Sequence, residues 1–134
     1  MALVEWNEQL SVGVLEMDTQ HKRLVEMINR LHEAMAKGEG AVVLKTIVNE
    51  LVTYTKVHFA SEERLLASRQ YPALAAHKQL HEHFTAKVVE MQEKIQAGKM
   101  VTSVGVGNFL RDWLVHHIQQ EDKRYGRHLC GVAC

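Results

Sequence analysis

Residues 77–84 read HKQLHEHF and carry three histidines in eight positions. His77 and His81 are four residues apart, so a helix places both on one face, about 5–6 Å apart at Cβ. The same face carries a series of apolar residues, which are Leu74, Phe84, Val88, Met91 and Ile95. A helix that directs two imidazoles toward a hydrophobic core must also provide partners for them.

Two segments before this stretch have the same helical periodicity, and the chain shows no sustained strand alternation. A first helix is expected to start after Asp18 or Thr19, either of which can cap its N-terminus. The sequence KGEG at 37–40 ends this helix. A second helix follows and is broken by SRQYP at 68–72, which contains Pro72, the single proline of the chain.

The opening stretch belongs to a third helix, which is expected to end near Ala97 with Gly98 as its C-cap. A fourth amphipathic helix is expected to begin near Thr102 or Ser103. Because the connections are short, successive helices should run antiparallel. The predicted fold is therefore all-α, an up-down-up-down antiparallel four-helix bundle with a non-helical N-terminal arm.

The charge balance argues against a general affinity for nucleic acid or for anionic membranes. The 134-residue chain has 16 basic and 16 acidic side chains, and its formal net charge is zero. No apolar run is long enough to span a bilayer. The first residues, MALVEWNEQL, lack the basic start and apolar segment of a secretory signal. We therefore expect a soluble, cytoplasmic protein with no membrane span and no nucleic-acid partner.

The length predicts one domain over residues 1–134, with an arm at 1–18 and a tail at about 126–134. Trp6 is the expected anchor of the arm. The two cysteines, Cys130 and Cys134, both lie in the tail and form no disulfide framework. Their C-x₃-C spacing would allow metal binding or oxidation, but two free thiols in a disordered tail are the favoured interpretation.

Each of the four predicted helices places at least one histidine on its apolar face, and Glu62 follows His58 by one turn on the same face. A lone histidine in such a position is usually a core residue bonded to a carbonyl group. Burying polar groups without partners costs about 1–3 kcal/mol each, against a total stability of about 5–15 kcal/mol. Metal coordination would satisfy all of these groups together. The histidines concerned are His21, His58, His77, His81 and His117.

The chain resembles the bacterial hemerythrins over nearly its whole length. The resemblance begins with VEWNEQLSVGVLEMDTQHKRLVEMINRL, continues through HFASEE, YPALAAHKQLH and FLRDWLVHHIQQED, and fades in the tail. The ordered pattern H…HxxxE…HxxxH…HxxxxD matches at seven positions. This resemblance implies a hemerythrin-like domain and a non-heme diiron site.

The resemblance also implies the role of each matched residue. His77, His81 and His117 would bind one iron, and His21 and His58 would bind the other. Glu62 and Asp122 would bridge the two irons, which would also share an oxo or hydroxo bridge. The iron held by two histidines would keep an open position, at which O2 would bind.

The spacing of His117 and Asp122 does not fit a regular α-helix. Residues five apart lie roughly 140° apart around the helix axis, so both can face one site only if the helix widens into a π-type turn or ends there. Glu121, four residues after His117, fits a regular helix better. The family pattern favours Asp122, and we adopt it.

Apolar residues near the open iron would form the wall of an O2 pocket. Ordinary core packing is compatible with the same positions. The candidates are Leu114, Trp113, Ile118, Phe59, Leu24 and Val25. His32, His83, His116 and His128 are not expected to be ligands. The charged residues expected on exposed faces are Glu63, Arg64, Lys78, Glu82, Arg111 and Asp112.

The function predicted from these features is reversible O2 binding for storage, delivery or buffering, without enzymatic activity. Five neutral histidines against two carboxylates differ from the carboxylate-rich sites of ferritin-like oxidases. O2 is the expected ligand, with an O2-consuming enzyme or a reductant as a candidate partner. The alternatives are O2 or redox sensing, a diiron oxidase, a peroxidase, a nitric-oxide-handling protein, or iron storage.

Overall fold

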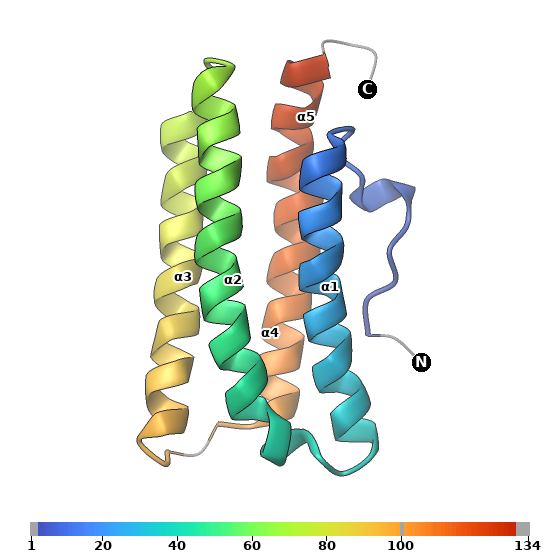
Figure 1. Ribbon diagram of the computed structural model, residues 1–134, viewed down its shortest axis with the longest axis vertical. Helices are drawn as coiled ribbons and strands as arrows, with labels where there is room; N and C mark the ends of the chain where they lie inside the picture. Colours follow the sequence, from blue (N-terminus) through green and yellow to red (C-terminus); the bar gives the residue numbers. More distant parts are fainter. Residues whose placement is uncertain (1–2, 100, 131–134) are drawn as a thin grey trace.

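The computed structural model describes residues 3–99 and 101–130, which form long helices joined by short turns. The elements are η1 (Glu8–Leu10, a 3₁₀ turn), α1 (Leu15–Ala36), α2 (Gly40–Ser68), α3 (Leu74–Gln96), α4 (Ser103–His116), η2 (His117–Asp122, a π-helix) and α5 (Lys123–Cys130). Figure 1 shows that α4, η2 and α5 form one continuous rod. Successive rods run in opposite directions, which confirms the predicted all-α, up-down-up-down four-helix bundle.

Glycine in the left-handed conformation ends two of the helices. Gly38 follows α1 and Gly98 follows α3, each with φ of +75°, a conformation that favours glycine. At the second of these turns, the Gly98 N–H donates to the Ile95 carbonyl and the Lys99 N–H donates to the Lys94 carbonyl. These bonds satisfy carbonyl groups at the end of α3, where the C-cap is Ala97 and Gly98, the predicted C-cap, is the next residue.

The first helix begins earlier than the sequence predicted. It starts at Leu15, after an extended Val14, and neither Asp18 nor Thr19 caps it. The Asp18 carboxylate instead accepts hydrogen bonds from the Ser11 hydroxyl at 2.6 Å and from the Val12 N–H at 2.8 Å. The prediction of the helix start was wrong because this acidic side chain ties down the preceding arm rather than its own helix.

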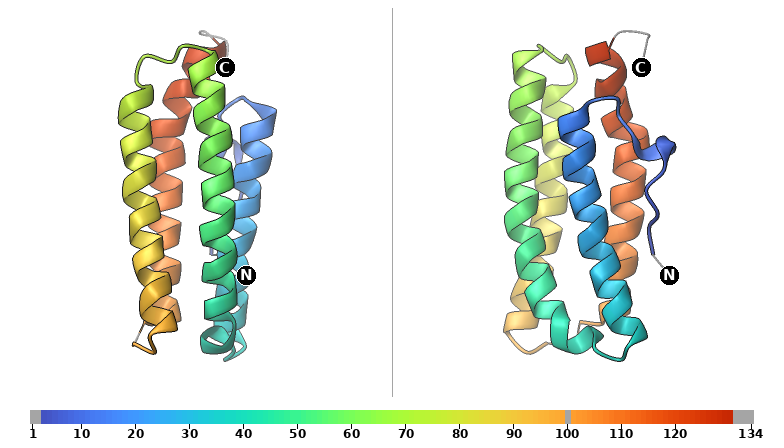
Figure 2. Two further views of the ribbon diagram at one scale, coloured as in Figure 1. Left: turned by 60° about the vertical axis from the view of Figure 1, so that its left-hand side comes forward. Right: turned by 45° about the vertical axis from the view of Figure 1, so that its right-hand side comes forward.

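The N-terminal arm packs along the bundle and is not wholly irregular, because it contains η1. In Figure 2 the arm runs beside the rod made of α4, η2 and α5. Asn29 of α1 fixes its beginning, since its side chain accepts from the Val4 N–H at 2.9 Å and donates to the Val4 carbonyl at 2.8 Å. Trp6 is half-buried, and the Lys22 ammonium lies 5.3 Å from its ring centroid.

The predicted tail is helical as far as Cys130, so the expected boundary at about 126 was wrong. Tyr125 is fully buried, and Gly126 packs directly against the Val12 carbonyl of the arm. These contacts explain why the chain continues as α5. Cys134 lies outside the described residues, and the interpretation of the two cysteines as free thiols stays a prediction.

We expect Gly126→Ala to destabilise the protein, because the added Cβ would clash with the Val12 carbonyl and displace the arm. Overpacking of this kind costs about 1–3 kcal/mol. Gly107→Ala is the matched control, since a Cβ at Gly107 would make ordinary contacts with Met35, Leu3 and Leu31, and alanine favours the helix. Urea denaturation should show a loss for the first variant and none for the second. Equal stability of both variants would contradict the proposed contact.

The interior of the bundle differs between its two ends. Aliphatic side chains of α1, α2 and α4 fill the end that contains the α1–α2 turn, and include Leu31, Leu44, Ile47, Val48, Leu51 and Leu110. The predicted histidines lie in the other half, near the start of α1 and the end of α2. Among the described residues, no helix combines the length and apolar character that a bilayer crossing requires.

Candidate metal centre

The structure brings together all seven residues that the sequence pattern singled out. They come from all four rods of the bundle and are between 0 and 4 % exposed: His21, His58, Glu62, His77, His81, His117 and Asp122. On a regular helix, spacings of four residues place His58 with Glu62, and His77 with His81, on one face. The helical periodicity therefore accounts for most of the cluster, and the packing of the rods against each other completes it.

Glu62 stands between two groups of histidines. Its Oε1 lies 2.8 Å from His77 Nε2 and 3.0 Å from His81 Nε2. Its Oε2 lies 3.3 Å from His21 Nε2 and 3.6 Å from His58 Nε2. One carboxylate therefore presents a separate oxygen to each group.

Asp122 repeats this arrangement from the rod formed by α4, η2 and α5. Its Oδ1 lies 3.0 Å from His117 Nε2 and 3.1 Å from His77 Nε2, and its Oδ2 lies 3.1 Å from His21 Nε2. The donor atoms fall into two groups, in each of which all atoms lie within 4.8 Å of one another: Glu62, His77, His81, His117 and Asp122 form one, and His21, His58 and Glu62 form the other. This geometry suits two adjacent cations that share carboxylates.

Several of these buried atoms have no hydrogen-bond partner within the described part of the chain. They are both ring nitrogens of His21, Nε2 of His81, Nε2 of His117 and both carboxylate oxygens of Asp122. Some of these histidine nitrogens lie 3.0–3.1 Å from a carboxylate oxygen, which is a hydrogen-bonding distance. The angles between the two groups, however, do not meet the geometry of a hydrogen bond. Unpaired buried polar atoms are costly, and a metal ion would satisfy them together. Imidazole and carboxylate donors are compatible with iron, and imidazole also suits zinc, copper and nickel.

The π-helix decides between Asp122 and Glu121. η2 widens the helix over His117–Asp122, which is one of the two possibilities that the five-residue spacing left open. Asp122 is buried in the cluster, whereas Glu121 is partly exposed and its carboxylate lies 3.5 Å from the Arg124 guanidinium. The geometry therefore brings Asp122, and not Glu121, to the histidines.

The two carboxylates change the protonation of the neighbouring imidazoles. Burial lowers the pKa of His21, but Asp122 and Glu62 outweigh this effect and raise it to about 10. The same balance raises the pKa of His77 to about 9. Burial dominates at His58 and lowers its pKa to about 4. Burial also disfavours the charged carboxylates, but the surrounding histidines hold the pKa of Glu62 and Asp122 below the usual range.

We expect iron loading at pH 7 to release roughly two protons per chain. His21 and His77, with pKa values of about 10 and about 9, are protonated at this pH in the metal-free protein, and each must lose its proton to bind a metal. A pH indicator in weakly buffered, oxygen-free solution measures the release on adding ferrous ion. No proton release at full iron occupancy would contradict the assignment of these two histidines as ligands.

Three polar residues next to the cluster were missed by the sequence reasoning. Gln20 Oε1 lies 2.6 Å from His58 Nδ1, and Glu63 Oε2 lies 2.8 Å from His81 Nδ1. The Tyr125 hydroxyl donates to Glu62 Oε2 at 2.8 Å, and burial together with Glu62 raises the Tyr125 pKa well above its usual value.

The assignment of Glu63 to an exposed face was wrong, because its side chain is only 24 % exposed and binds His81. Tyr125 could have been found from the sequence, since it follows Asp122 by three residues and so lies on the same helix face. Gln20 and Glu63 carry no comparable signal, because they lie beside ligand positions in the sequence and reach histidines of other helices.

The residues predicted to line a pocket divide into two kinds. Phe59 stacks on the His81 ring at 3.7 Å between centroids, and Trp113 stacks on the His117 ring at 4.3 Å. Trp113 is partly buried and packs against the apolar core. These two rings therefore cover the three-histidine group. The remaining four residues are buried aliphatic side chains of α1, α4 and η2: Leu24, Val25, Leu114 and Ile118.

The histidines that were excluded as ligands lie outside both donor groups. His83, His116 and His128 are exposed, and His32 is partly exposed. None of the four belongs to a candidate metal-binding cluster among the described residues.

The comparisons with known proteins agree with this geometry. The family described as Hemerythrin HHE cation binding domain matches residues 12–129. The chain belongs to the hemerythrin family. It is 42 % identical to the bacteriohemerythrin of Pseudomonas aeruginosa over 125 residues, which covers 93 % of this chain and 80 % of that protein. Its identity to the bacteriohemerythrin of Methylococcus capsulatus is 35 %, covering 94 % and 96 % of the two chains.

Solved hemerythrin structures share the fold of this hemerythrin-family chain. A wild-type hemerythrin crystal structure superposes with a TM-score of 0.85 at 35 % identity, covering 93 % of this chain and 96 % of that one. A leucine-to-alanine mutant of hemerythrin gives a TM-score of 0.86 at 34 % identity, covering 94 % and 96 %.

Proposed function

We propose that this hemerythrin-family chain binds O2 reversibly at a pair of non-heme iron ions. The observation that carries this proposal is the pair of buried carboxylates, each of which presents one oxygen to the three-histidine group and the other to the two-histidine group. His77, His81 and His117 would hold one iron, His21 and His58 would hold the other, and Glu62 and Asp122 would join them. An oxo or hydroxo bridge would complete the pair.

The two halves of the centre are unequal, and this inequality supports gas binding at one of them. One donor group contains five residues and the other contains three. When bound, the iron pair would supply two electrons and an open coordination position for O2 on the two-histidine side. Glu62 and Asp122 offset the charge repulsion between the two ions, which allows them to lie close together.

The buried residues around the centre would keep water away from it. Leu24, Leu114 and Ile118 offer no polar side-chain atom, and each is at most 5 % exposed. Phe59 and Trp113 cover the three-histidine group by stacking on its rings. Excluding water would limit the irreversible oxidation of the iron pair. The apolar residues around the centre therefore favour the release of bound O2 as O2.

Hydrogen bonds from the Nδ1 atoms of His58 and His81 to Gln20 Oε1 and Glu63 Oε2 would fix the two rings with Nε2 directed at the metal. We expect Glu63→Ala to lower iron affinity by about 10–100-fold, because His81 loses the carboxylate that orients it and raises its basicity. Glu63→Gln, which keeps an acceptor oxygen without the charge, should lose less. Competition with a chelator measures both affinities. An unchanged affinity in Glu63→Ala would contradict this role.

Redox enzyme chemistry and sensing are the competing functions. Rapid turnover with a reductant would support an oxidase or peroxidase, whereas slow decay of the oxygenated form supports a carrier. The histidine-rich donor set favours the carrier. A cytoplasmic location, and an O2-consuming enzyme or a reductant as partner, stay predictions.

The test is to reduce the iron-loaded protein without oxygen, then to admit and remove O2 while recording iron content and the visible spectrum. Reversible binding predicts two irons per chain and an absorption band that appears with O2 and disappears when O2 is removed. Oxidation to a stable product without a reversible band would favour an enzyme or a sensor. Protein that takes up no iron would defeat the diiron proposal.

A further inference from the structure

A series of aromatic rings connects the candidate metal centre to the surface, at the end of the bundle where α2 ends and α5 runs. Tyr125 is fully buried, and its ring centroid lies 5.6 Å from that of His77. Tyr71 is partly exposed, and its ring lies 6.4 Å from Tyr125 and 6.5 Å from His77. The exposed His128 lies 5.3 Å from Tyr71. The half-exposed Tyr71 ring therefore contacts both the surface residue His128 and the predicted metal ligand His77.

Contacts of this kind matter for electron transfer, because its rate falls steeply with the gap between donor and acceptor. An electron that arrives at Tyr71 would be one ring contact from His77. Tyr54 offers a second short approach, since its half-exposed ring stacks at 6.4 Å from the His58 ring. The ring distances alone do not distinguish Tyr71 from Tyr54 as the point at which an electron enters.

The charge around the two tyrosines distinguishes them. Burial raises the pKa of Tyr71, Arg124 and Arg127 oppose that shift, and Glu121 and the buried Asp122 add to it. Lys123 and Arg127, together with Glu8 of the arm, line a cavity of about 300 Å³ between α5 and the arm. Beside Tyr54, by contrast, the groove contains Arg23 and Arg30, and each is balanced by a carboxylate. Glu50 lies 2.8 Å from Arg30, and Glu26 opposes the effect of Arg23 on the pKa of Tyr54.

The surface around Tyr71 is basic. Arg124 and Arg127 act on Tyr71, Arg69 precedes it by two residues at the end of α2, and Glu121 offsets one of these charges by its contact with Arg124 at 3.5 Å. A basic surface increases the rate at which an oppositely charged protein docks. The partner that fits this surface is acidic.

We propose that this end of the bundle, formed by Tyr71, His128, Arg124 and Arg127, is the port at which an acidic one-electron carrier protein reduces the oxidised centre. The proposal rests on the proposed diiron function, since a carrier that loses its electrons needs a source of new ones. Two carrier molecules each give up one electron, and the two ferric ions each gain one and become ferrous. Tyr71 and His77 provide the path.

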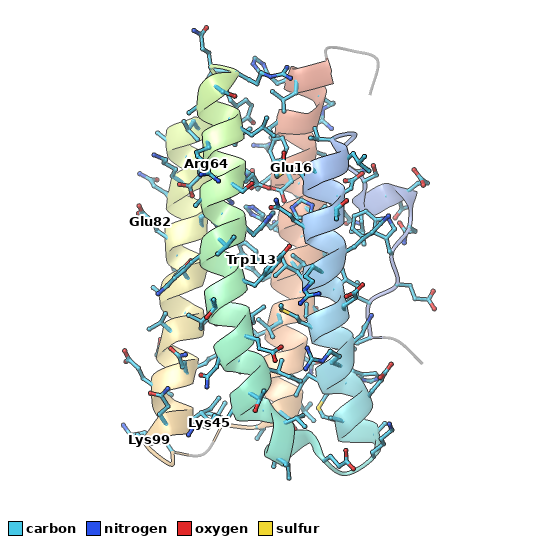
Figure 3. All side chains as sticks on the ribbon, in the orientation of Figure 1. Glu16, Lys45, Arg64, Glu82, Lys99 and Trp113 are labelled. Atoms are coloured by element: carbon cyan, nitrogen blue, oxygen red, sulfur yellow. The ribbon has the colours of Figure 1, made fainter. Side chains whose placement is uncertain are left out.

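Reduced plant-type ferredoxin, an acidic [2Fe–2S] protein, is the probe. Stopped-flow absorbance follows its oxidation by the diferric, iron-loaded protein at several salt concentrations, and calorimetry follows its binding. Arg124→Gln/Arg127→Gln removes two charges at the port. Lys45→Gln/Lys99→Gln removes two exposed charges at the opposite end (Figure 3) and is the matched control. Tyr71→Leu interrupts the ring contacts, and Tyr54→Leu is its control.

The port predicts that the arginine variant binds ferredoxin at least about fivefold more weakly at low salt and shows a flatter salt dependence, while the lysine variant does not. Tyr71→Leu should slow reduction several-fold at saturating ferredoxin and leave binding unchanged, and Tyr54→Leu should do neither. Equal effects of both charge variants, or equal rates in both tyrosine variants, would overturn the port. Reversible O2 binding in the same samples shows that only the port has failed, whereas absence of bound iron overturns the proposed function as well.

Discussion

Glu62→Ala should reduce the iron content from two ions per chain to one or fewer. Glu62 is fully buried and belongs to both donor groups, with Oε1 next to His77 and His81 and Oε2 next to His21 and His58. Its removal leaves the two-histidine group with fewer donors and leaves the Tyr125 hydroxyl without its acceptor. Asp122 would then be the one remaining carboxylate to offset the charge repulsion between two adjacent cations. Atomic absorption on the purified protein measures the outcome.

Glu82→Ala is the control for this experiment. Glu82 is exposed on the outer side of α3, away from the centre (Figure 3), so the variant should retain two irons. Circular dichroism shows whether Glu62→Ala is still helical, which separates loss of metal from loss of fold. A folded Glu62→Ala variant with two irons and a normal response to O2 would contradict the role of Glu62 as the shared ligand.

Removal of iron should lower the melting temperature by roughly 10 °C at pH 7. A metal present at 100 times its Kd adds about 2.7 kcal/mol of stability. For a domain of this size that corresponds roughly to the stated shift. The physical reason is local, since iron removal leaves buried atoms of His21, His81, His117 and Asp122 without partners. Thermal unfolding followed by circular dichroism, with and without a chelator, measures the difference.

The difference in melting temperature should grow as the pH rises from 7 to 9. The raised pKa values of His21, about 10, and His77, about 9, stabilise the metal-free fold fully below about pH 6.5, the pKa of unfolded histidine. This contribution is lost as the pH rises through 9 and 10. Iron binding becomes stronger over the same range because fewer protons compete for the imidazoles. A difference that shrinks with rising pH would contradict the protonation states described above.

Most of the bundle could be predicted from the sequence, because helical periodicity and glycine turns act locally. The same reasoning brought His58 to Glu62 and His77 to His81. It also predicted that the helix either widens or ends between His117 and Asp122, since these residues cannot share a face of a regular helix, and the structure has the first of these, a π-helix. These features depend on spacing within one segment, which a sequence records directly.

Contacts between distant segments could not be predicted in this way. Asp18 looked like a helix cap, but its carboxylate binds the arm at Ser11 and Val12. Glu63 looked exposed, but α3 brings His81 within 2.8 Å of it. The tail was expected to be irregular, yet Gly126 packs against the arm and α5 continues to Cys130. Each of these outcomes depends on how helices pack and not on a local pattern.

The central claim is that two irons share Glu62 and Asp122 between unequal groups of histidines. Anomalous diffraction from crystals of the iron-loaded protein, recorded at the iron absorption edge, tests it most directly. We expect two peaks per chain, one beside His77, His81 and His117 and the other beside His21 and His58, with both carboxylates contacting both peaks. A single peak, or a peak bound by Glu121 in place of Asp122, would contradict it.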